Sequence, residues 1–189
     1  SKHEIQKNVS LFTTSLQEFS NLRNVIFCAL MAGIAIVLNS LVSIDIGPYI
    51  RIGFSGIPNR VVEYLFGPAI GSLFGGALDI LKYFLKPNGT FFPGFTFNVM
   101  LAGIIYGYFL YKKPISIFRI FIAEFLVKAI VNCFLNTLWL SFINGKAFFA
   151  ILPIRIIKNI IMLPIDSIIL FIILTFIAKT IKPMFQTNS

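Results

Sequence analysis

The sequence predicts an all-α integral membrane protein built as a six-helix bundle, and three observations predict this class. The chain has 189 residues, of which 57% are hydrophobic and 12% are charged, whereas soluble domains carry about 25% charged residues. The apolar residues form long runs, and the lysines and arginines lie between these runs, as at the ends of membrane helices. At about 20 residues per span plus connections, the length allows about six or seven spans and no soluble catalytic domain.

Composition also excludes several function classes. The net charge of +9 does not indicate nucleic-acid binding, because the basic residues flank apolar runs. Cys28 and Cys133 lie inside such runs, where cysteine acts as a small apolar residue, and neither has a partner at metal-ligand spacing. No nucleophile motif and no phosphate-binding loop is found. We therefore expect no enzymatic activity, no metal and no cofactor in this chain.

The chain is predicted to divide into three parts. Residues 1–22 form an amphipathic segment, because apolar side chains recur at helical spacing from Ile5 to Phe19. A tail that becomes ordered only against a partner is the alternative. Residues 23–182 form the membrane domain, and 183–189 form a short tail.

Six spans follow from the apolar runs and from the glycines and prolines that interrupt them. The first span has Ala29 and Gly33 one turn apart, which lets another helix approach closely. That helix could belong to this chain or to a separate subunit. Gly67-Pro68 ends a short second span, and Asn144-Gly145 ends the fifth. The six spans are predicted over about 24–42, 57–66, 69–85, 96–110, 120–142 and 153–177.

The stretch 92–107 is the most unusual part of the sequence. Phe92, Pro93, Gly94 and Phe95 predict a rigid aromatic turn that leads directly into an apolar helix rich in small residues. Irregular backbone at the end of a membrane helix is costly unless it is buried in protein or lines a cavity. The turn therefore either forms the wall of a ligand pocket or only connects two spans, and the residues alone leave both open.

The distribution of lysine and arginine predicts the orientation of the bundle. With both termini on one side, that side receives most of the basic residues, and the side with more of them faces the cytoplasm. Loops 45–56, 86–95 and 143–154 then face outward. The basic residues expected inside are Lys2, Lys7, Arg23, Lys112, Lys113, Arg119, Lys179 and Lys182, and those expected outside are Arg51, Lys86, Lys146 and Arg155.

Ionisable side chains inside the predicted spans are costly unless they are paired. Most have an opposite charge three or four residues away, which can share one helix face. Asp166 has none within a turn, so it requires a partner from another helix, a ligand or a proton. The pairs expected within one helix are Arg60 with Glu63, Asp79 with Lys82, and Glu124 with Lys128.

A second group of charges has one sign only. Arg155 and Lys158 lie three residues apart at the outer end of the last span, with Lys146 close to them in the sequence. We expect these cations to form a basic mouth suited to an anionic ligand. Ordinary anchoring of long basic side chains at the membrane interface is the alternative.

Several motifs carry a family resemblance. They are Arg51-Ile52-Gly53-Phe54, Leu65-Phe66-Gly67-Pro68, Gly75-Gly76-Ala77-Leu78-Asp79, Phe92-Pro93-Gly94-Phe95-Thr96 and Asn136-Thr137-Leu138-Trp139-Leu140. These blocks resemble the substrate-binding (S) subunits of energy-coupling factor (ECF) vitamin transporters, and the Phe92–Thr96 block resembles the folate-type subunits in particular. Asn98 and Asp166 depart from the pattern, which has a small residue and an uncharged amide at these positions.

The resemblance implies a multi-pass subunit of the cell membrane that captures a vitamin at the outer face. It would associate with a transmembrane coupling subunit and two ATPase subunits, which supply the ATP hydrolysis. Ala29 and Gly33 match the motif through which the first helix of this family contacts the coupling subunit.

Folate capture agrees with the chemistry of the residues. Phe92, Phe95 and Trp139 can stack on a flat pterin ring, and asparagine or aspartate side chains can bind its polar edge. Basic side chains suit the two carboxylates of the glutamate tail. The expected substrate-binding residues are Arg51, Phe54, Asp79, Phe92, Pro93, Gly94, Phe95, Asn98, Trp139, Lys146, Arg155 and Asn159.

Three alternatives remain at this point. An S subunit for another vitamin or precursor, such as biotin or pantothenate, would share the fold but not a pocket with aromatic faces and a polar edge. An intramembrane enzyme acting on lipid would need a metal-holding acid pair or a nucleophile with its base, and neither is found. A membrane assembly protein without transport function would leave the proline-glycine motifs and the basic mouth unexplained.

Overall fold

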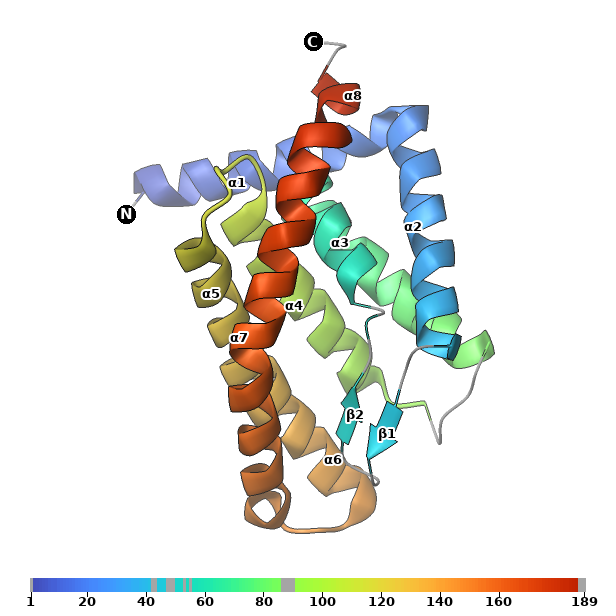
Figure 1. Ribbon diagram of the computed structural model, residues 1–189, viewed down its shortest axis with the longest axis vertical. Coiled ribbons are helices and arrows are strands. Elements are labelled where there is room, and N and C mark those ends of the chain that lie inside the picture. Colours follow the sequence, from blue (N-terminus) through green and yellow to red (C-terminus); the bar gives the residue numbers. More distant parts are fainter. Residues whose placement is uncertain are drawn as a thin grey trace.

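The all-α membrane fold predicted from the sequence is confirmed by the computed structural model, which describes residues 2–41, 44–46, 50–52, 54, 56–85 and 91–186. Long helices run side by side, and α1 lies across one end of the bundle (Figure 1). The helices are α1 (Lys2–Gln17), α2 (Leu22–Leu41), α3 (Ile57–Leu85), α4 (Pro93–Leu110), α5 (Ile117–Leu126), α6 (Asn136–Asn144), α7 (Phe148–Thr180) and α8 (Lys182–Gln186). Two further helical segments are the 3₁₀ turn η1 (Glu18–Ser20) and the π-helix η2 (Val127–Leu135).

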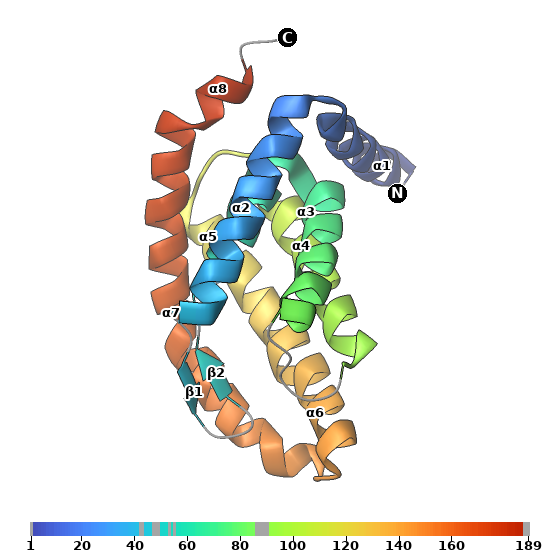
Figure 2. The ribbon, with the colours of Figure 1, turned by 90° about the vertical axis from the view of Figure 1, so that its right-hand side faces the viewer.

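The two ends of the bundle differ. Both chain termini and α1 lie at one end, which we call the terminal end, and the β1–β2 hairpin and the α6–α7 connection lie toward the other, the hairpin end (Figure 2). The hairpin is an addition to the predicted all-helical fold. Its strands, β1 (Ile44–Ile46) and β2 (Ile50–Ile52), are antiparallel, with Asp45 opposite Arg51.

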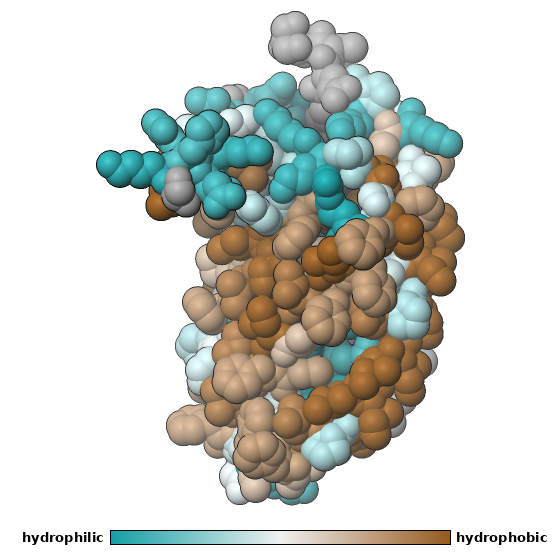
Figure 3. All heavy atoms as spheres, turned by 90° about the vertical axis from the view of Figure 1, so that its left-hand side faces the viewer, coloured by the Kyte–Doolittle hydropathy of each residue, from teal (hydrophilic) through white to brown (hydrophobic). Residues whose placement is uncertain are grey.

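The outer surface supports a membrane location. Hydrophilic atoms gather at the terminal end, whereas the wall of the bundle is mostly hydrophobic (Figure 3). In the part of the chain that the structure describes, α2, α3, α4 and the segment Phe148–Met184 are each long and apolar enough to cross a membrane. A further rod of helix, from α5 through η2 to α6, runs over Ile117–Asn144.

The predicted break at Gly67-Pro68 is present. Gly67 has φ 94° and ψ −176°, a backbone conformation open to glycine and costly for other residues. It divides α3 into two arms. The first arm, 57–66, rises about 15 Å, half of the hydrocarbon thickness of about 30 Å, and nearly all of its side chains are buried. This arm therefore lies inside the bundle and does not cross the membrane by itself.

Helix α1 holds this break in place. Ser15 is fully buried, and its hydroxyl donates to the carbonyl of Phe66 (2.5 Å) and accepts from the N–H of Ile70 (3.1 Å). These backbone groups flank the break, where helical hydrogen bonds are missing. The amphipathic segment predicted for the membrane surface is thus also tied to the core.

Helix α4 packs tightly against the second arm of α3. A Cβ atom on Gly107 would lie 2.4 Å from the Cα of Pro68, so only glycine allows the two backbones to approach this closely. Around this contact lies the apolar core, which joins both arms of α3 to α4, α5, η2 and α7. Its fully buried members include Val62, Phe66, Ile70, Ile120 and Leu174.

Two predicted boundaries are corrected. The aromatic proline-glycine stretch is not an irregular turn: Phe92 is the extended N-cap, and α4 begins at Pro93, a first-turn position that suits proline because its missing N–H has no helical partner there. Helix α7 begins at Phe148, before Pro153, and continues through both Pro153 and Pro164. Membrane helices tolerate proline where neighbouring groups satisfy the freed carbonyls.

Candidate ligand-binding site

Four aromatic side chains meet where the start of α4 packs against α6. The ring of Phe92 lies 5.8 Å from that of Phe95, 5.3 Å from that of Trp139 and 6.2 Å from that of Phe142, measured between centroids. We call these residues the aromatic cluster. The sequence predicted that Phe92, Phe95 and Trp139 would act together, and the structure brings them together; Phe142 is an addition.

Gly94 allows the cluster to form. A Cβ atom at this position would lie 2.5 Å from Cε1 of Phe92 and 2.8 Å from Cε2 of Trp139. The first turn of α4 therefore lies directly against the two rings. Pro93, by contrast, is exposed on the outer side of this turn.

A continuous row of hydrogen bonds leads away from the cluster. The indole N–H of Trp139 donates to Asn98 (3.1 Å), Asn98 donates to Asn136 (2.5 Å), and Asn136 is 3.5 Å from Asn132. Asn132 donates to Asn159 (3.3 Å). These four asparagines, from α4, α6, η2 and α7, form the amide row.

The amide row ends at Arg155. The side chain of Asn159 donates to the carbonyl of Arg155 (2.7 Å), and Nε of Arg155 donates to the carbonyl of Asn132 (3.2 Å). Arg155 is 7% exposed. It therefore lies inside the bundle, and not at the exposed basic mouth that the sequence predicted; Lys146, on the α6–α7 connection, is exposed.

The amide row has unused hydrogen-bonding capacity. A carboxamide has two donors and two acceptor lone pairs, and each link of the row uses one donor and one acceptor. Asn132 and Asn136 are half-buried, whereas Asn98 and Asn159 are buried. The arrangement can thus offer both donors and acceptors to the edge of a flat heteroaromatic ring that stacks on the aromatic cluster.

The structure describes the other predicted site residues only in part. Asp79, on the second arm of α3, accepts a hydrogen bond from Thr96 of α4 (2.7 Å). Phe54 is 38% exposed. For Arg51 only the backbone, in β2, is described, so its predicted side-chain role lies outside the described residues.

Sequence reasoning missed Asn132, Asn136 and Phe142 as site residues. A signal was present, because Asn132, Asn136 and Lys128 are polar residues four apart in an apolar run. An α-helix turns by about 100° per residue, so Lys128 and Asn136, which are eight residues apart, would point about 80° apart around the helix axis. The wider turns of the π-helix keep these side chains nearer to one face, and single-sequence reading does not predict a π-helix.

Comparisons with known proteins show the family of this chain. The model of the family "ECF transporter, substrate-specific component" matches residues 23–174. This chain belongs to that family.

Relatives within the family share much of the chain. The folate transporter FolT of Clostridium novyi is 36% identical over 146 residues, 77% of this chain and 84% of that protein. FolT of Leuconostoc mesenteroides is 31% identical over 174 residues, 87% of this chain and 92% of that protein. A crystal structure of FolT bound with folic acid matches with a TM-score of 0.74 and 32% identity, covering 80% of this chain and 92% of that one.

This substrate-specific component also holds a second polar network, the ionic row. Two N–H groups of Arg60 donate to both carboxylate oxygens of Glu63 (2.6 and 2.8 Å), and the guanidinium lies 3.8 Å from the ring centroid of Tyr106. The Tyr106 hydroxyl donates to Glu124 (2.7 Å). Lys128 lies 3.7 Å from Glu124. The predicted pairs Arg60–Glu63 and Glu124–Lys128 are therefore present.

The partner of Asp166 is also resolved. Lys128 Nζ donates to Asp166 Oδ2 at 2.6 Å, a shorter contact than the one with Glu124. Of the three partners that the sequence left open for Asp166, the structure gives the residue from another helix.

The small residues of α2 face outward. Ala29 and Gly33 are exposed, and a Cβ atom built on Gly33 meets nothing within 4 Å in the part of the chain that the structure describes. The sequence left open whether these residues pack against a helix of this chain or a separate subunit. Within the described residues, no helix of this component covers Gly33.

Proposed function

We propose that this chain is the folate-binding subunit of an ECF transporter, which captures folate at the outer face of the cell membrane for ATP-driven uptake. It is a binding subunit and not an enzyme: a transmembrane coupling subunit and two ATPase subunits supply the energised step. The name and bound folic acid of the matching FolT structure support this ligand, as do the two relatives named as folate transporters.

The observation that carries the proposal is the continuous row from Trp139 to Arg155. It joins the three chemical elements that folate requires: aromatic faces for the pterin, carboxamides for its edge, and a cation for the carboxylate tail. We assign ring stacking to Phe92, Phe95 and Trp139, and edge recognition to Asn98 and Asn159, with Asn136 beside them. Arg155 is a cation in direct contact with this row, through the carbonyl of Asn132.

The remaining predicted residues complete the proposal. Gly94 and Pro93 shape the start of α4, Asp79 fixes Thr96, and Phe54, Arg51 and Lys146 belong to the outward-facing loops. The two carboxylates of folate are costly to desolvate, so we expect the tail to point toward water.

We further propose the orientation and the coupling surface. Both termini face the cytoplasm, so the hairpin end faces outward, in agreement with the predicted excess of basic residues inside. The coupling subunit packs on α2 at Ala29 and Gly33. Small residues allow close helix approach in lipid, where packing and not hydrophobicity drives association.

The test is equilibrium binding to the full chain in detergent. Trp139 is the only tryptophan, so its fluorescence reports on the aromatic cluster directly. We expect saturable quenching by folic acid and none by biotin or pantothenate. Quenching by one of those vitamins but not by folate would favour the alternative of an S component for another vitamin.

A matched pair of variants tests the site. Arg155→Ala is expected to weaken folate binding about tenfold or more, because a charge-assisted contact to a carboxylate is lost. Lys179→Ala removes the same charge from an exposed position near the terminal end of the same helix. Equal affinity losses in both variants would argue against a role for Arg155 in the site.

A further inference from the structure

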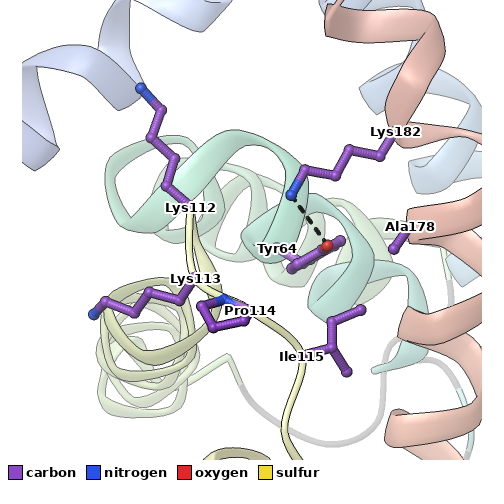
Figure 4. Close-up of a pocket in the computed structure, with 7 residues that line it drawn as sticks. All are labelled: Tyr64, Lys112, Lys113, Pro114, Ile115, Ala178 and Lys182. Carbon is purple, nitrogen blue, oxygen red and sulfur yellow. Dashed lines mark hydrogen bonds between the residues drawn. The ribbon is translucent and has the colours of Figure 1, made fainter.

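An open pocket of about 520 Å³ lies at the terminal end, away from the candidate folate site. Its lining comes from four parts of the chain: the first arm of α3, the α4–α5 connection, α7 and α8 (Figure 4). The lining residues are Tyr64, Lys112, Lys113, Pro114, Ile115, Ala178 and Lys182.

Two polar groups meet inside this pocket. Lys182 Nζ donates to the hydroxyl of Tyr64 at 3.2 Å and lies 4.9 Å from its ring centroid. Tyr64 is buried. Among the described residues its hydroxyl has no acceptor for its own proton, so it can donate to a ligand oxygen while it accepts from Lys182.

The positive charge around the pocket is not neutralised. In the described part of the chain, Lys112, Lys113 and Lys182 make no ion pair with an acidic side chain. Lys112 has a left-handed backbone with φ 54°, and its ammonium lies 5.4 Å from the ring centroid of Tyr111. The hydroxyl of Tyr111 in turn donates to Glu18 (3.0 Å).

Lys113 adds positive charge near the pocket, but its ammonium group does not point into it. Its side chain points away from the pocket (Figure 4) and donates to the carbonyl of Tyr108. Burial lowers the pKa of Lys113, and the nearby charges of Arg119 and Lys7 lower it further. The like charges of Arg119 and Lys7 therefore disfavour the ammonium form of Lys113, and a bound anion nearby would offset this repulsion.

The lining also has an apolar side. Pro114, Ile115 and Ala178 lie beside the polar groups. Pro114 and Ile115 follow the end of α4, and Ala178 lies in the last turn of α7. A ligand that fits both sides has an anionic phosphate joined to an apolar body. Basic pockets between helices at the cytoplasmic end of membrane proteins bind lipid head groups of this kind.

We propose that this pocket binds the phosphate group of an anionic membrane lipid, held by Lys182 and the Tyr64 hydroxyl. The side chain of Lys112 points away from these two groups (Figure 4) and adds positive charge at the edge of the pocket. The site is separate from the amide row, so it does not depend on the identity of the transported ligand. A lipid phosphate and a free phosphate ion would present the same anionic oxygens to these groups. The apolar lining favours the lipid phosphate, because a lipid also has an apolar body.

Native mass spectrometry of the full chain in detergent tests this proposal. The probes are phosphatidylglycerol, the zwitterionic phosphatidylcholine, and inorganic phosphate. We expect phosphatidylglycerol to bind in preference to phosphatidylcholine, and inorganic phosphate not to displace it. Displacement by inorganic phosphate would assign the pocket to a free anion, and equal binding of both lipids would overturn the proposal.

Three variants locate the binding. Lys182→Gln is expected to weaken phosphatidylglycerol binding about fivefold, as one interfacial lysine contributes. Tyr64→Phe removes the hydroxyl without changing the charge, and a lower phosphatidylglycerol affinity of this variant indicates a defined site.

Lys179→Gln is the matched control, because Lys179 is exposed at the same end but does not line the pocket. An equal loss of phosphatidylglycerol affinity in Lys179→Gln would mean that general surface charge, and not the pocket, causes the effect. Circular dichroism checks that each variant is folded.

Discussion

The ionic row and the amide row cross the same apolar bundle, but they use hydrogen bonding in opposite ways. In the ionic row each charge is matched by another group of the chain: Arg60 by Glu63, and Lys128 by Glu124 and Asp166. In the amide row each asparagine forms one link in each direction and keeps further donors and acceptors. The first network is closed, and the second is open to a ligand.

This difference indicates a division of labour. Charges in a membrane interior are costly unless compensated, so they are best suited to fixing helices against one another. Neutral carboxamides are less costly to leave partly unpaired, so they can face a site that is filled and emptied. We therefore expect substitutions in the ionic row to change stability, and substitutions in the amide row to change ligand affinity.

The largest expected effect comes from Arg60→Met. Glu63 is 1% exposed, and without Arg60 its carboxylate loses both hydrogen bonds that Arg60 donates. Breaking a buried ion pair from one side costs about 3–5 kcal/mol of stability. Thermal or denaturant unfolding of the detergent-purified protein measures this loss.

A double variant provides the control for that prediction. Arg60→Met combined with Glu63→Leu removes both charges and is expected to recover much of the stability. If the single variant unfolds like the natural protein, the ionic row does not hold the bundle together, and the proposed contrast between the two rows fails.

Asn98→Ala tests the amide row and is expected to lower folate affinity. The substitution breaks the links to both Trp139 and Asn136, and we predict a loss of folate affinity of about thirtyfold, or about 2 kcal/mol. Calorimetric titration measures the affinity without relying on the fluorescence of Trp139.

Asn144→Ala is the matched control, because Asn144 is exposed at the end of α6 and, among the described residues, its side chain donates to the carbonyl of Leu140 in the same helix. It should bind folate like the natural protein. Unchanged affinity in Asn98→Ala would remove the amide row from the site.

Ser15→Ala tests a third kind of contact, in which one hydroxyl joins α1 to the break in α3. Loss of its hydrogen bonds to Phe66 and Ile70 is expected to cost about 1–2 kcal/mol of stability and to leave folate affinity unchanged. Hydrogen exchange of the amide of Ile70 should rise. Protection that stays at its natural level would mean that the hydroxyl does not support this break.

The smallest effect is expected for Asp166→Asn. The side chain of Asp166 is 32% exposed, and Lys128 retains Glu124 as a second partner. We predict a stability loss of about 1 kcal/mol or less, as for partly exposed ion pairs. A stability loss as large as that of Arg60→Met would show that the half-exposed end of the ionic row contributes as much stability as its buried end.

Much of the fold was predictable from the sequence because it depends on local spacing. Apolar runs gave the helices, Gly67-Pro68 marked the break in α3, and Gly145 marked the end of α6, where it has φ 67°. The pairs Arg60–Glu63 and Glu124–Lys128 lie within single helices, so their separation along the chain fixed their geometry.

The candidate site was predictable only in part. Phe92, Phe95, Asn98, Trp139, Arg155 and Asn159 were named from residue type and resemblance. The burial of Arg155 and the roles of Asn132 and Asn136 were not foreseen. These features depend on the rotation of η2 and on the depth at which α7 packs beside it.

The sequence by itself thus determined a membrane bundle of the S-component type, its helix breaks and its within-helix ion pairs. The tertiary structure alone decided which polar groups meet across helices: Lys128 with Asp166, Ser15 with the break in α3, and the asparagines with one another. The physical reason is that partners on one helix are set by about 1.5 Å of rise per residue. Partners on different helices are set by packing, which no local spacing encodes.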